Sequence, residues 1–270
     1  MQRFAQLLRT SRSQRGRTQH QLAEAADIST RHLSFIENGR SQPSRDMVTL
    51  LVDALDVPMR ERNDWFVAAG FAPVYTETAL DAGTLSEARA ALRLILRAHE
   101  PLPAVCFDRR GELRMVNQAC LAFAGALGLP IGAFQAYELI AEPRPNLMSL
   151  LLLHDGLRAC IANWNEVAML AVDRARRELM RVRDKTLRAL LEAAVTQSGL
   201  TRTAADDAPR LIVPVELLFG DKRLRFFSTI TTFGTAFDIT LDELRIEALH
   251  AADSETERVV RSSGWLASGT

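Results

Sequence analysis

The segment from Thr18 to Leu55 constrains the fold more than any other part of the sequence. Its apolar residues recur at helical spacing in three short runs, bounded by residues that begin or end helices. Thr18 and Gln21 form a capping box at the start of the first run, and Ser29 is a good N-cap for the second. Asn38-Gly39 ends the second run, because glycine readily adopts the left-handed conformation that terminates helices. The pattern predicts three short helices, the first two joined by a tight turn.

The predicted helix that follows Ser29 has two nearly opposed faces. On a wheel of about 100° per residue, Leu33 and Ile36 fall near 300° and 240°, on an arc that faces a core. The other arc is centred near 70° on the same wheel. It carries Thr30, Arg31, Ser34 and Phe35. The second face therefore presents an arginine and an aromatic ring to something outside the domain.

The major groove of DNA is a partner that fits such a face, because it admits an α-helix and displays base edges that differ in donors, acceptors and methyl groups. Arg31 could reach a guanine edge, Thr30 and Ser34 could donate or accept, and Phe35 could pack on a thymine methyl. Two helices joined by a turn of about three or four residues form a helix-turn-helix, whose second helix enters the groove. The sequence thus predicts a DNA-binding domain, and a helical module that docks on another protein is the alternative.

This segment resembles the DNA-binding domain of the xenobiotic-response-element (XRE) family and of the phage lambda-type repressors. The opening T-Q-x-x-L-A begins at Thr18, and the stretch I-S-x-x-x-[LIV]-S-x-[LIV]-E-x-G-x-x-x-P is matched from Ile28 to Pro43. The resemblance implies an all-α, lambda-repressor-like domain of five helices that binds double-stranded DNA. One departure is visible in the turn, where the family usually has glycine and this chain has Asp27. Aspartate tolerates the left-handed conformation better than most residues.

Phosphate contacts are expected around these helices. The resemblance places them at Gln19, Asn38 and Arg40. Arg15 and Arg17 lie in a stretch at the start of the chain that has arginines and no acidic residue. Such a stretch is typical of a surface that meets an anionic partner, and a solvated helix face is the alternative. We expect binding by a homodimer on a palindromic operator, with an affinity that falls steeply with salt.

Proline, glycine and polar segments predict two domains along the chain. Residues 1–72 are expected to form the helix-turn-helix domain and residues 73–100 a linker with a connecting helix. Residues 101–260 are expected to form an α+β domain, and residues 261–270 a C-terminal tail.

The second domain is predicted to contain an antiparallel sheet. Strand-like runs at 104–108 and 113–117 flank a turn, and those at 211–219 and 224–233 flank another, which predicts two hairpins. Residues 235–240 and 244–249 are expected to complete the sheet. Between the hairpins, residues 146–198 are predicted to be mostly helical.

Three blocks resemble the MmyB-like regulators, a bacterial branch of the XRE family. They are residues 60–73, 161–179 and 233–253, and they occur in the family's order. The family often reads P-A-D where this chain has Ala251-Ala252-Asp253. The resemblance implies a C-terminal domain of PAS-like fold that binds a lipid-like ligand, with a fatty acid as the leading candidate. We predict that this ligand modulates DNA binding. A domain that serves dimerisation alone, or a helical protein-interaction adaptor, remain alternatives.

A sheet with helices across one face can enclose a hollow for an apolar ligand. Candidate lining residues are Phe107, Met115, Phe226, Phe227, Ile230 and Phe233, each of which could equally be ordinary sheet core. A carboxylate head group would need a cation or amide donors. Arg158, Asn163 and Trp164 are the candidates, although Arg158 could instead pair with an acid and the other two could cap and pack a helix.

Other kinds of chemistry are not expected. The 33 basic and 33 acidic residues cancel, so net charge names no partner. The five histidines form no metal or catalytic pattern, and we expect no enzyme activity, cofactor or metal. His154 is expected to be a turn or cap residue rather than a haem ligand, and Cys106 is not expected to react with flavin. The chain begins with no signal-peptide run and has no membrane-spanning stretch, so we expect a cytoplasmic location.

Overall fold

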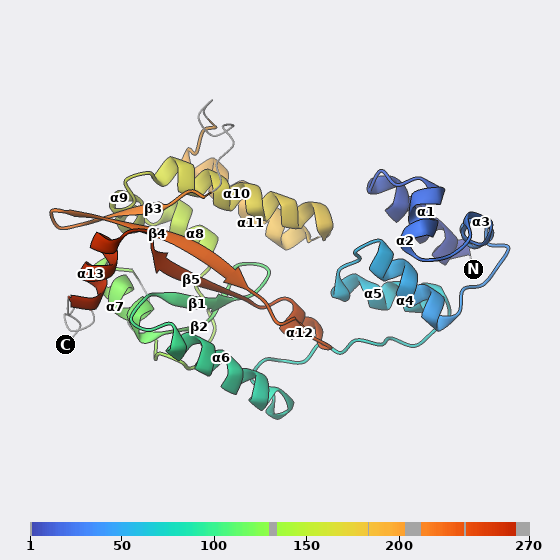
Figure 1. Ribbon diagram of the computed structural model, residues 1–270, viewed down its shortest axis with the longest axis horizontal. Coiled ribbons are helices and arrows are strands. Elements are labelled where there is room, and N and C mark those ends of the chain that lie inside the picture. The colour runs from blue at the N-terminus through green and yellow to red at the C-terminus, as the bar shows by residue number, and fades with distance from the viewer. Residues whose placement is uncertain (1, 130–133, 183, 203–211, 235, 263–270) are drawn as a thin grey trace. The chain divides into compact units, whose positions relative to one another are not determined.

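The computed structural model describes residues 2–129, 134–182, 184–202, 212–234 and 236–262, drawn as ribbons in Figure 1. The chain divides into two compact units. One contains residues 1–77 together with 237–239, and the other contains the rest of the chain. The predicted two-domain organisation is confirmed.

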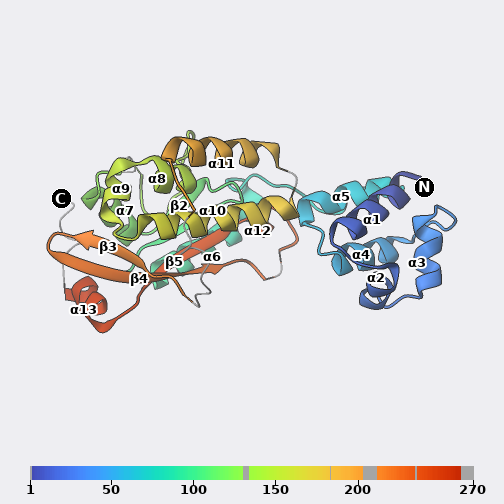
Figure 2. The same ribbon diagram turned by 90° about the horizontal axis from the view of Figure 1, so that it is seen from above.

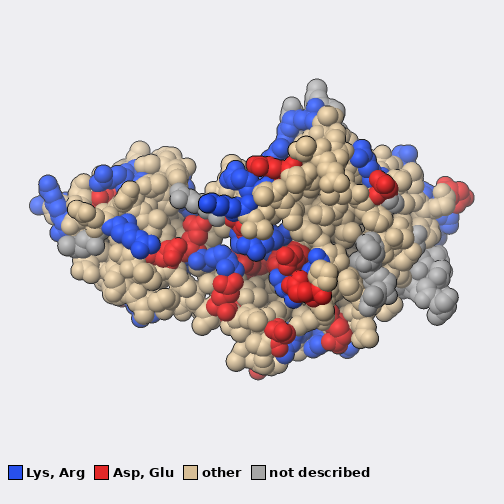
Figure 3. Space-filling model, turned by 180° about the vertical axis from the view of Figure 1, so that it is seen from behind, with Lys and Arg blue, Asp and Glu red and all other residues tan. Residues whose placement is uncertain are grey.

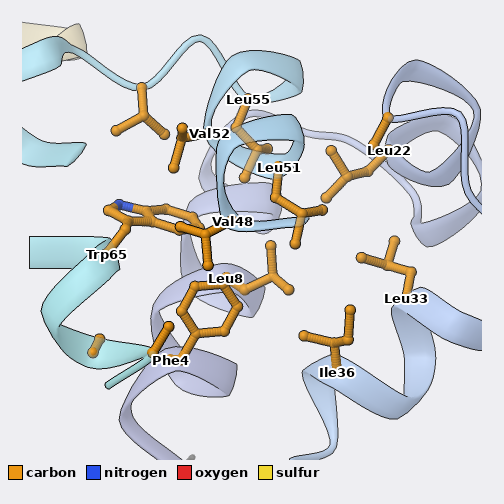
Figure 4. Packing of buried hydrophobic residues seen from close by; sticks show 14 of the residues in the cluster. Phe4, Leu8, Leu22, Leu33, Ile36, Val48, Leu51, Val52, Leu55 and Trp65 are labelled. Atoms are coloured by element: carbon orange, nitrogen blue, oxygen red, sulfur yellow. The ribbon is translucent and has the colours of Figure 1, made fainter. Parts of the chain in front are cut away.

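Within its described residues, the N-terminal unit consists of five helices, as predicted. They are α1 (Gln2–Gln14), α2 (Gln19–Ala25), α3 (Thr30–Glu37), α4 (Arg45–Ala54) and α5 (Met59–Ala68). All five contribute apolar side chains to one core (Figure 4). In it, the rings of Trp65 and Phe4 meet edge to face with centroids 5.7 Å apart, an arrangement that aromatic pairs prefer. Leu33 and Ile36 of α3 point into the same core.

Local capping contacts set the helix boundaries around the first turn. The Thr18 hydroxyl accepts a hydrogen bond from the Gln21 N–H at 3.1 Å, and the Gln21 side chain accepts one from the Thr18 N–H at 2.8 Å. The predicted capping box is therefore present. The Ser29 hydroxyl caps α3 as predicted. Asp27 lies in the turn with φ of 51°, the left-handed conformation expected for it, and Gly39 ends α3 with φ of 67°.

The C-terminal unit is built on an antiparallel sheet with the strand order β2-β1-β5-β4-β3. The strands are β1 (Ala104–Phe107), β2 (Leu113–Val116), β3 (Val215–Phe219), β4 (Lys222–Thr231) and β5 (Arg245–Ala251). Both predicted hairpins are confirmed, because β1 pairs with β2 and β3 pairs with β4. β5 lies between them and joins the hairpins into one sheet.

The strand predicted at residues 235–240 is wrong for the described part of that segment. The short helix α12 (Ile239–Asp242) begins there. Asp238 accepts a hydrogen bond from the Thr76 hydroxyl at 2.9 Å, and the Ile239 N–H donates to the Thr76 carbonyl. The segment therefore pairs with the chain that follows α5 and not with the sheet.

Helices cover both faces of the sheet (Figures 1 and 2). They are η1 (Gly83–Leu85), α6 (Ser86–Ala98), α7 (Gln118–Ala126), α8 (Leu147–Leu153), α9 (Asp155–Cys160), α10 (Trp164–Arg181), α11 (Lys185–Ser198) and α13 (Ser254–Ser262). α6 packs through Leu92 and Leu96 against Met115 and its neighbours on one face, while α8, α10 and α11 pack on the other. The predicted α+β fold is confirmed, although helices were expected across one face alone. In the part of the chain that the structure describes, no helix has the length and apolar character to cross a membrane.

Candidate DNA-binding surface and ligand cavity

Helix α3 carries the two opposed faces predicted from its periodicity. Leu33 and Ile36 are buried, with exposed fractions of 0% and 1%. Arg31 is exposed and its guanidinium lies over the Phe35 ring, 5.4 Å from the centroid. Thr30 is exposed beside it, and Ser34 and Phe35 are half-buried. The outer face thus combines a cation, an aromatic ring and hydroxyl groups on one exposed surface.

Glu37 at the end of α3 is buried and joins three helices. Its carboxylate accepts hydrogen bonds from Arg12 Nε at 2.6 Å and Arg12 Nη2 at 3.0 Å, and from Gln19 Nε2 at 2.7 Å. The Glu37 carbonyl also accepts from Arg9 Nη2 at 2.7 Å. The hydrogen bond to Glu37 raises the pKa of Arg12 above its usual value. These contacts fasten α1 and α2 to the helix that presents the outer face.

Gln19 makes a hydrogen bond within the domain, whereas the family resemblance implied a contact with a DNA phosphate. Its amide points to the Glu37 carboxylate, because a buried carboxylate requires hydrogen-bond donors. On the helical wheel of about 100° per residue, Glu37 falls near 340°, beside the arc that faces the core. An acid at that position was the available signal that inward-pointing donors would surround it.

Arg15 and Arg17 also make contacts within the N-terminal unit. Arg15 Nη1 donates to the Ser11 hydroxyl at 2.9 Å, and Arg17 Nη1 donates to the Ala54 carbonyl at 2.5 Å. A guanidinium has five N–H donors, so one such bond to a carbonyl orients Arg17 without using its whole hydrogen-bonding capacity. On the face of this unit seen at the left of Figure 3, basic side chains form separate groups rather than one continuous patch.

Asn38 and Arg40 follow α3 and are both exposed. Asn38 Nδ2 donates to the Ser34 carbonyl at 2.8 Å, and its Oδ1 accepts from Arg9 Nη2 at 3.1 Å. Both residues lie just beyond the C-terminal end of α3, where a helix beside DNA could reach a phosphate.

The C-terminal unit contains a cavity of about 480 Å³ between the sheet and the helices α7 to α11. Its lining is mostly leucine, valine, isoleucine, alanine and phenylalanine. A volume of this size lies within the range of about 300–1,000 Å³ usual for small-molecule sites. The cavity can therefore take up an apolar ligand within one unit of the chain.

Two of the predicted ligand residues, Phe107 and Ile230, line this cavity. Met115 does not, because it is fully buried on the face of the sheet that packs against α6. Phe233 packs with that same cluster. Phe227 lies on the face of β4 opposite to the cavity, where its ring stacks on the His250 imidazole. Successive strand residues point to opposite faces, so neighbours in sequence separate in space.

The three predicted head-group residues lie outside the lining of the cavity. Arg158 donates to a carbonyl at the end of α11 and lies 3.9 Å from the Trp164 ring centroid. Trp164 is buried and donates through Nε1 to the Leu151 carbonyl. Asn163 holds the start of β3, donating to the Pro214 carbonyl at 2.8 Å. Asn163 and Trp164 therefore make the packing and backbone contacts that were the alternative to a role in ligand binding. Arg158 makes a cation–π contact with Trp164, whereas the alternative expected for it was a pair with an acid.

Sequence reasoning missed the charged residues that do line the cavity. They are Arg109, Arg110, Arg174, Arg245, Glu178 and Glu247. Arg109 and Arg110 belong to the turn between β1 and β2, which the sequence indicated as a turn and nothing more. Asp184 and Glu243 pair with Arg109 and Arg110 beside the lining, so the four arginines face four carboxylates in all.

Arg109, Arg110 and Asp184 form an ion cluster beside the cavity, in which Arg109 and Asp184 are buried. Arg109 Nη2 and Arg110 Nε each lie 2.9 Å from Asp184 Oδ2, and Asp184 Oδ1 accepts the N–H groups of Thr186 and Leu187 at the start of α11. Burial by itself would raise the pKa of Asp184. The hydrogen bonds from Leu187 and Arg110 and the two arginine charges outweigh it and lower the pKa to about 2.

We expect the stability supplied by Asp184 to be present above pH 3.8, its ordinary pKa, and to be lost as the pH falls through about 2. Asp184→Asn should lower the free energy of unfolding by about 2 kcal/mol at neutral pH and by far less in strong acid. Urea unfolding across this pH range measures the difference, with exposed Asp221→Asn as the control. A difference that stays constant throughout the range would contradict this assignment.

His154 and the buried cysteines have structural surroundings. His154 Nδ1 accepts the Leu157 N–H at 3.3 Å and caps α9, which confirms its interpretation as a cap residue. Burial raises the pKa of Cys106 and of Cys120 to about 12. Both thiols are therefore protonated at neutral pH and poor nucleophiles.

Comparison with known proteins finds a family match for the part of the chain that contains α3 and another for the part that contains the cavity. Residues 3–65 match the family described as a helix-turn-helix domain, and residues 88–262 match the MmyB-like transcription regulator ligand binding domain. The chain is also 36% identical over 53 residues to the transcriptional regulator ClgR from two strains of Mycobacterium tuberculosis. That match covers 20% of this chain and 47% of ClgR, so the chain spans about half the length of these curated relatives.

Proposed function

The chain belongs to the MmyB-like transcription regulators, and on that premise we propose that a fatty-acid-like ligand in its cavity modulates operator binding through α3. The apolar cavity of about 480 Å³ carries this proposal, because it lies in the domain that the family uses for ligand binding. A long alkyl chain is the kind of ligand that an extended, mostly apolar lining would stabilise.

On the DNA side, we propose that the outer face of α3 enters the major groove. Its base-contacting residues would be Thr30, Arg31, Ser34 and Phe35. Arg15, Arg17, Asn38 and Arg40 would contact phosphates. Gln19 would act indirectly, by holding Glu37 and with it the orientation of α3. Two copies related by two-fold symmetry would place two such helices in successive major grooves of a palindrome.

Selection of bound sites from random DNA, followed by affinity measurements, tests this proposal. Protein stripped of lipid and protein saturated with dodecanoate should differ in affinity for the selected operator by about 5-fold or more, in the range usual for coupled sites. Equal affinities at saturation would contradict modulation, and failure to select any sequence would contradict operator binding.

A variant pair separates the cavity from the rest of the domain. Ala171 lines the cavity from α10, so Ala171→Trp should fill part of it and abolish the response to dodecanoate while leaving operator binding intact. Ala189 is exposed on α11 and does not line the cavity, so Ala189→Trp is the matched control and should respond normally. If both variants lose the response of operator binding to dodecanoate, the loss cannot be assigned to filling of this cavity.

A further inference from the structure

Residues 237–239 follow β4 in the sequence, yet they belong to the compact N-terminal unit. Asp238 and Ile239 bind Thr76 there, and we call these three residues the clasp. The Thr76 hydroxyl donates to Asp238 Oδ2 at 2.9 Å, across 162 positions of sequence, and the Ile239 N–H donates to the Thr76 carbonyl at 2.8 Å. Thr76 and Asp238 also form an isolated parallel β-bridge. Asp238 is 7% exposed, and because a buried carboxylate requires hydrogen-bond donors, Thr76 supplies a contact that the fold needs.

On the N-terminal side of the clasp, helix α5 holds the residues that flank Thr76. Asn63 Nδ2 donates to the Tyr75 carbonyl at 2.8 Å, and Asn63 Oδ1 accepts the Tyr75 N–H at 3.0 Å. The Arg60 guanidinium donates to both carboxylate oxygens of Glu77, at 2.9 and 2.6 Å. Since α5 also contributes to the core against which α3 packs, the clasp is bound to the body of the DNA-binding domain.

On the other side, the chain leads from the clasp to the wall of the cavity through a short stretch of sequence. Helix α12 begins at Ile239, and β5 begins at Arg245, which lines the cavity together with Glu247. The turn between them is held firmly, because Arg245 Nη1 donates to the carbonyls of Asp242 and Leu244 at 2.6 and 3.0 Å. Closely packed interiors transmit strain, so a ligand that shifts β5 at the cavity wall also acts on the clasp.

We propose that the clasp transmits the state of the cavity to the DNA-binding domain. The inference rests on the proposed function and deepens it, because it names the element through which the ligand regulates operator binding. Coupling between two sites requires an element whose free energy both sites change. The clasp meets this requirement, since its hydrogen bonds join the segment that leads to the cavity wall to the segment that α5 holds. Asp238 and Thr76 are therefore coupling residues that contact neither the ligand nor the DNA.

The operator affinity of the full chain, measured without and with saturating dodecanoate, tests the proposal. The two affinities should differ by about 5-fold or more in the wild type and by less than about 2-fold in Asp238→Ala, which removes the acceptor of the clasp. Thr76→Val keeps the shape of the side chain but loses the hydroxyl donor, and it should reduce the response in the same way. Calorimetric titration should show unchanged dodecanoate binding in both variants, because neither residue lines the cavity.

Asp64→Ala is the matched control, because Asp64 is an exposed aspartate on α5 of the same unit, and it should keep the wild-type response. If Asp238→Ala and Thr76→Val respond to dodecanoate as the wild type does, the clasp does not couple the sites and the inference is overturned. An equal loss of response in the control would overturn it as well. A wild type that binds dodecanoate without any change in operator affinity would defeat the proposed modulation, and this inference with it.

Hydrogen exchange measured by mass spectrometry on the wild type gives a second readout. The Ile239 N–H donates to the Thr76 carbonyl, so its exchange reports directly on the clasp. Saturating dodecanoate should change the exchange of peptides that contain Ile239, together with those from β5. Unchanged exchange at Ile239 in a protein whose operator affinity does respond would overturn the inference while leaving the proposed function standing.

Discussion

Replacing Glu37 by alanine is expected to lower the free energy of unfolding of the N-terminal domain by about 3–5 kcal/mol, because it breaks a buried ion pair by removing one partner. Glu37 is 2% exposed, and the Arg12 side chain that pairs with it is 14% exposed. Without the carboxylate, the Arg12 guanidinium and the Gln19 amide both lose their buried acceptor. The loss should spread over α1, α2 and α3, since the three helices meet at this carboxylate.

Hydrogen exchange measured by mass spectrometry on peptides from these three helices reports that loss for the N-terminal domain separately. Glu24 is exposed on α2, so Glu24→Ala is the matched control and should change stability by less than about 0.5 kcal/mol. Replacing Arg12 and Glu37 together by methionine should recover much of the stability, because no unpaired buried charge remains. If the Glu37→Ala protein keeps the wild-type protection from hydrogen exchange, the Arg12–Glu37 pair contributes little to the stability of the domain.

Arg31→Ala is expected to weaken binding to the selected operator by about 1–3 kcal/mol and to relax specificity at the base pair that Arg31 contacts. Arg31 is exposed and lies over the Phe35 ring, which limits the orientations open to its guanidinium. Phe35→Ala should therefore weaken binding as well, by removing both the ring's own contact and its support for Arg31. Titration of labelled operator and of single-base variants measures both effects.

Arg40→Ala provides the contrast between base and phosphate contacts. Loss of a phosphate contact should weaken binding to operator and unrelated DNA alike, and should reduce the salt slope by about 1. Arg31→Ala should instead lower operator binding far more than binding to unrelated DNA. If Arg31→Ala and Phe35→Ala both keep full affinity and specificity, α3 is not the recognition helix and a protein-interaction role gains support.

The helix-turn-helix could be predicted because its signals are local. The Thr18 capping box, the Ser29 cap and the glycine stop at Gly39 each involve residues within a few positions of one another, and all three are present. The inward face of α3 follows from periodicity, which needs no knowledge of the rest of the fold. Here the local preference and the tertiary environment agree, which is typical of a natural sequence.

The cavity could not be predicted at the level of single residues. Met115 and Phe107 are similar in apolar character, yet one packs beneath α6 and the other lines the cavity. A strand's alternation separates its residues into two faces, but it does not say which face a given helix will cover. A register irregularity between Cys106 and Phe107 adds to the difficulty, because it shifts the alternation within β1.

By itself, the sequence determined the helices of the N-terminal domain, the outer face of α3, both hairpins and the family. Tertiary structure alone decided that Gln19 turns toward Glu37, that residues near Asp238 pair with Thr76, and that Arg109 meets Asp184 and Glu243 beside the cavity. The physical reason is the separation along the chain over which each kind of interaction acts. Caps and periodicity act over one or two turns of chain, whereas buried charges choose partners from whatever distant segments the fold brings near, according to the donors each leaves unsatisfied.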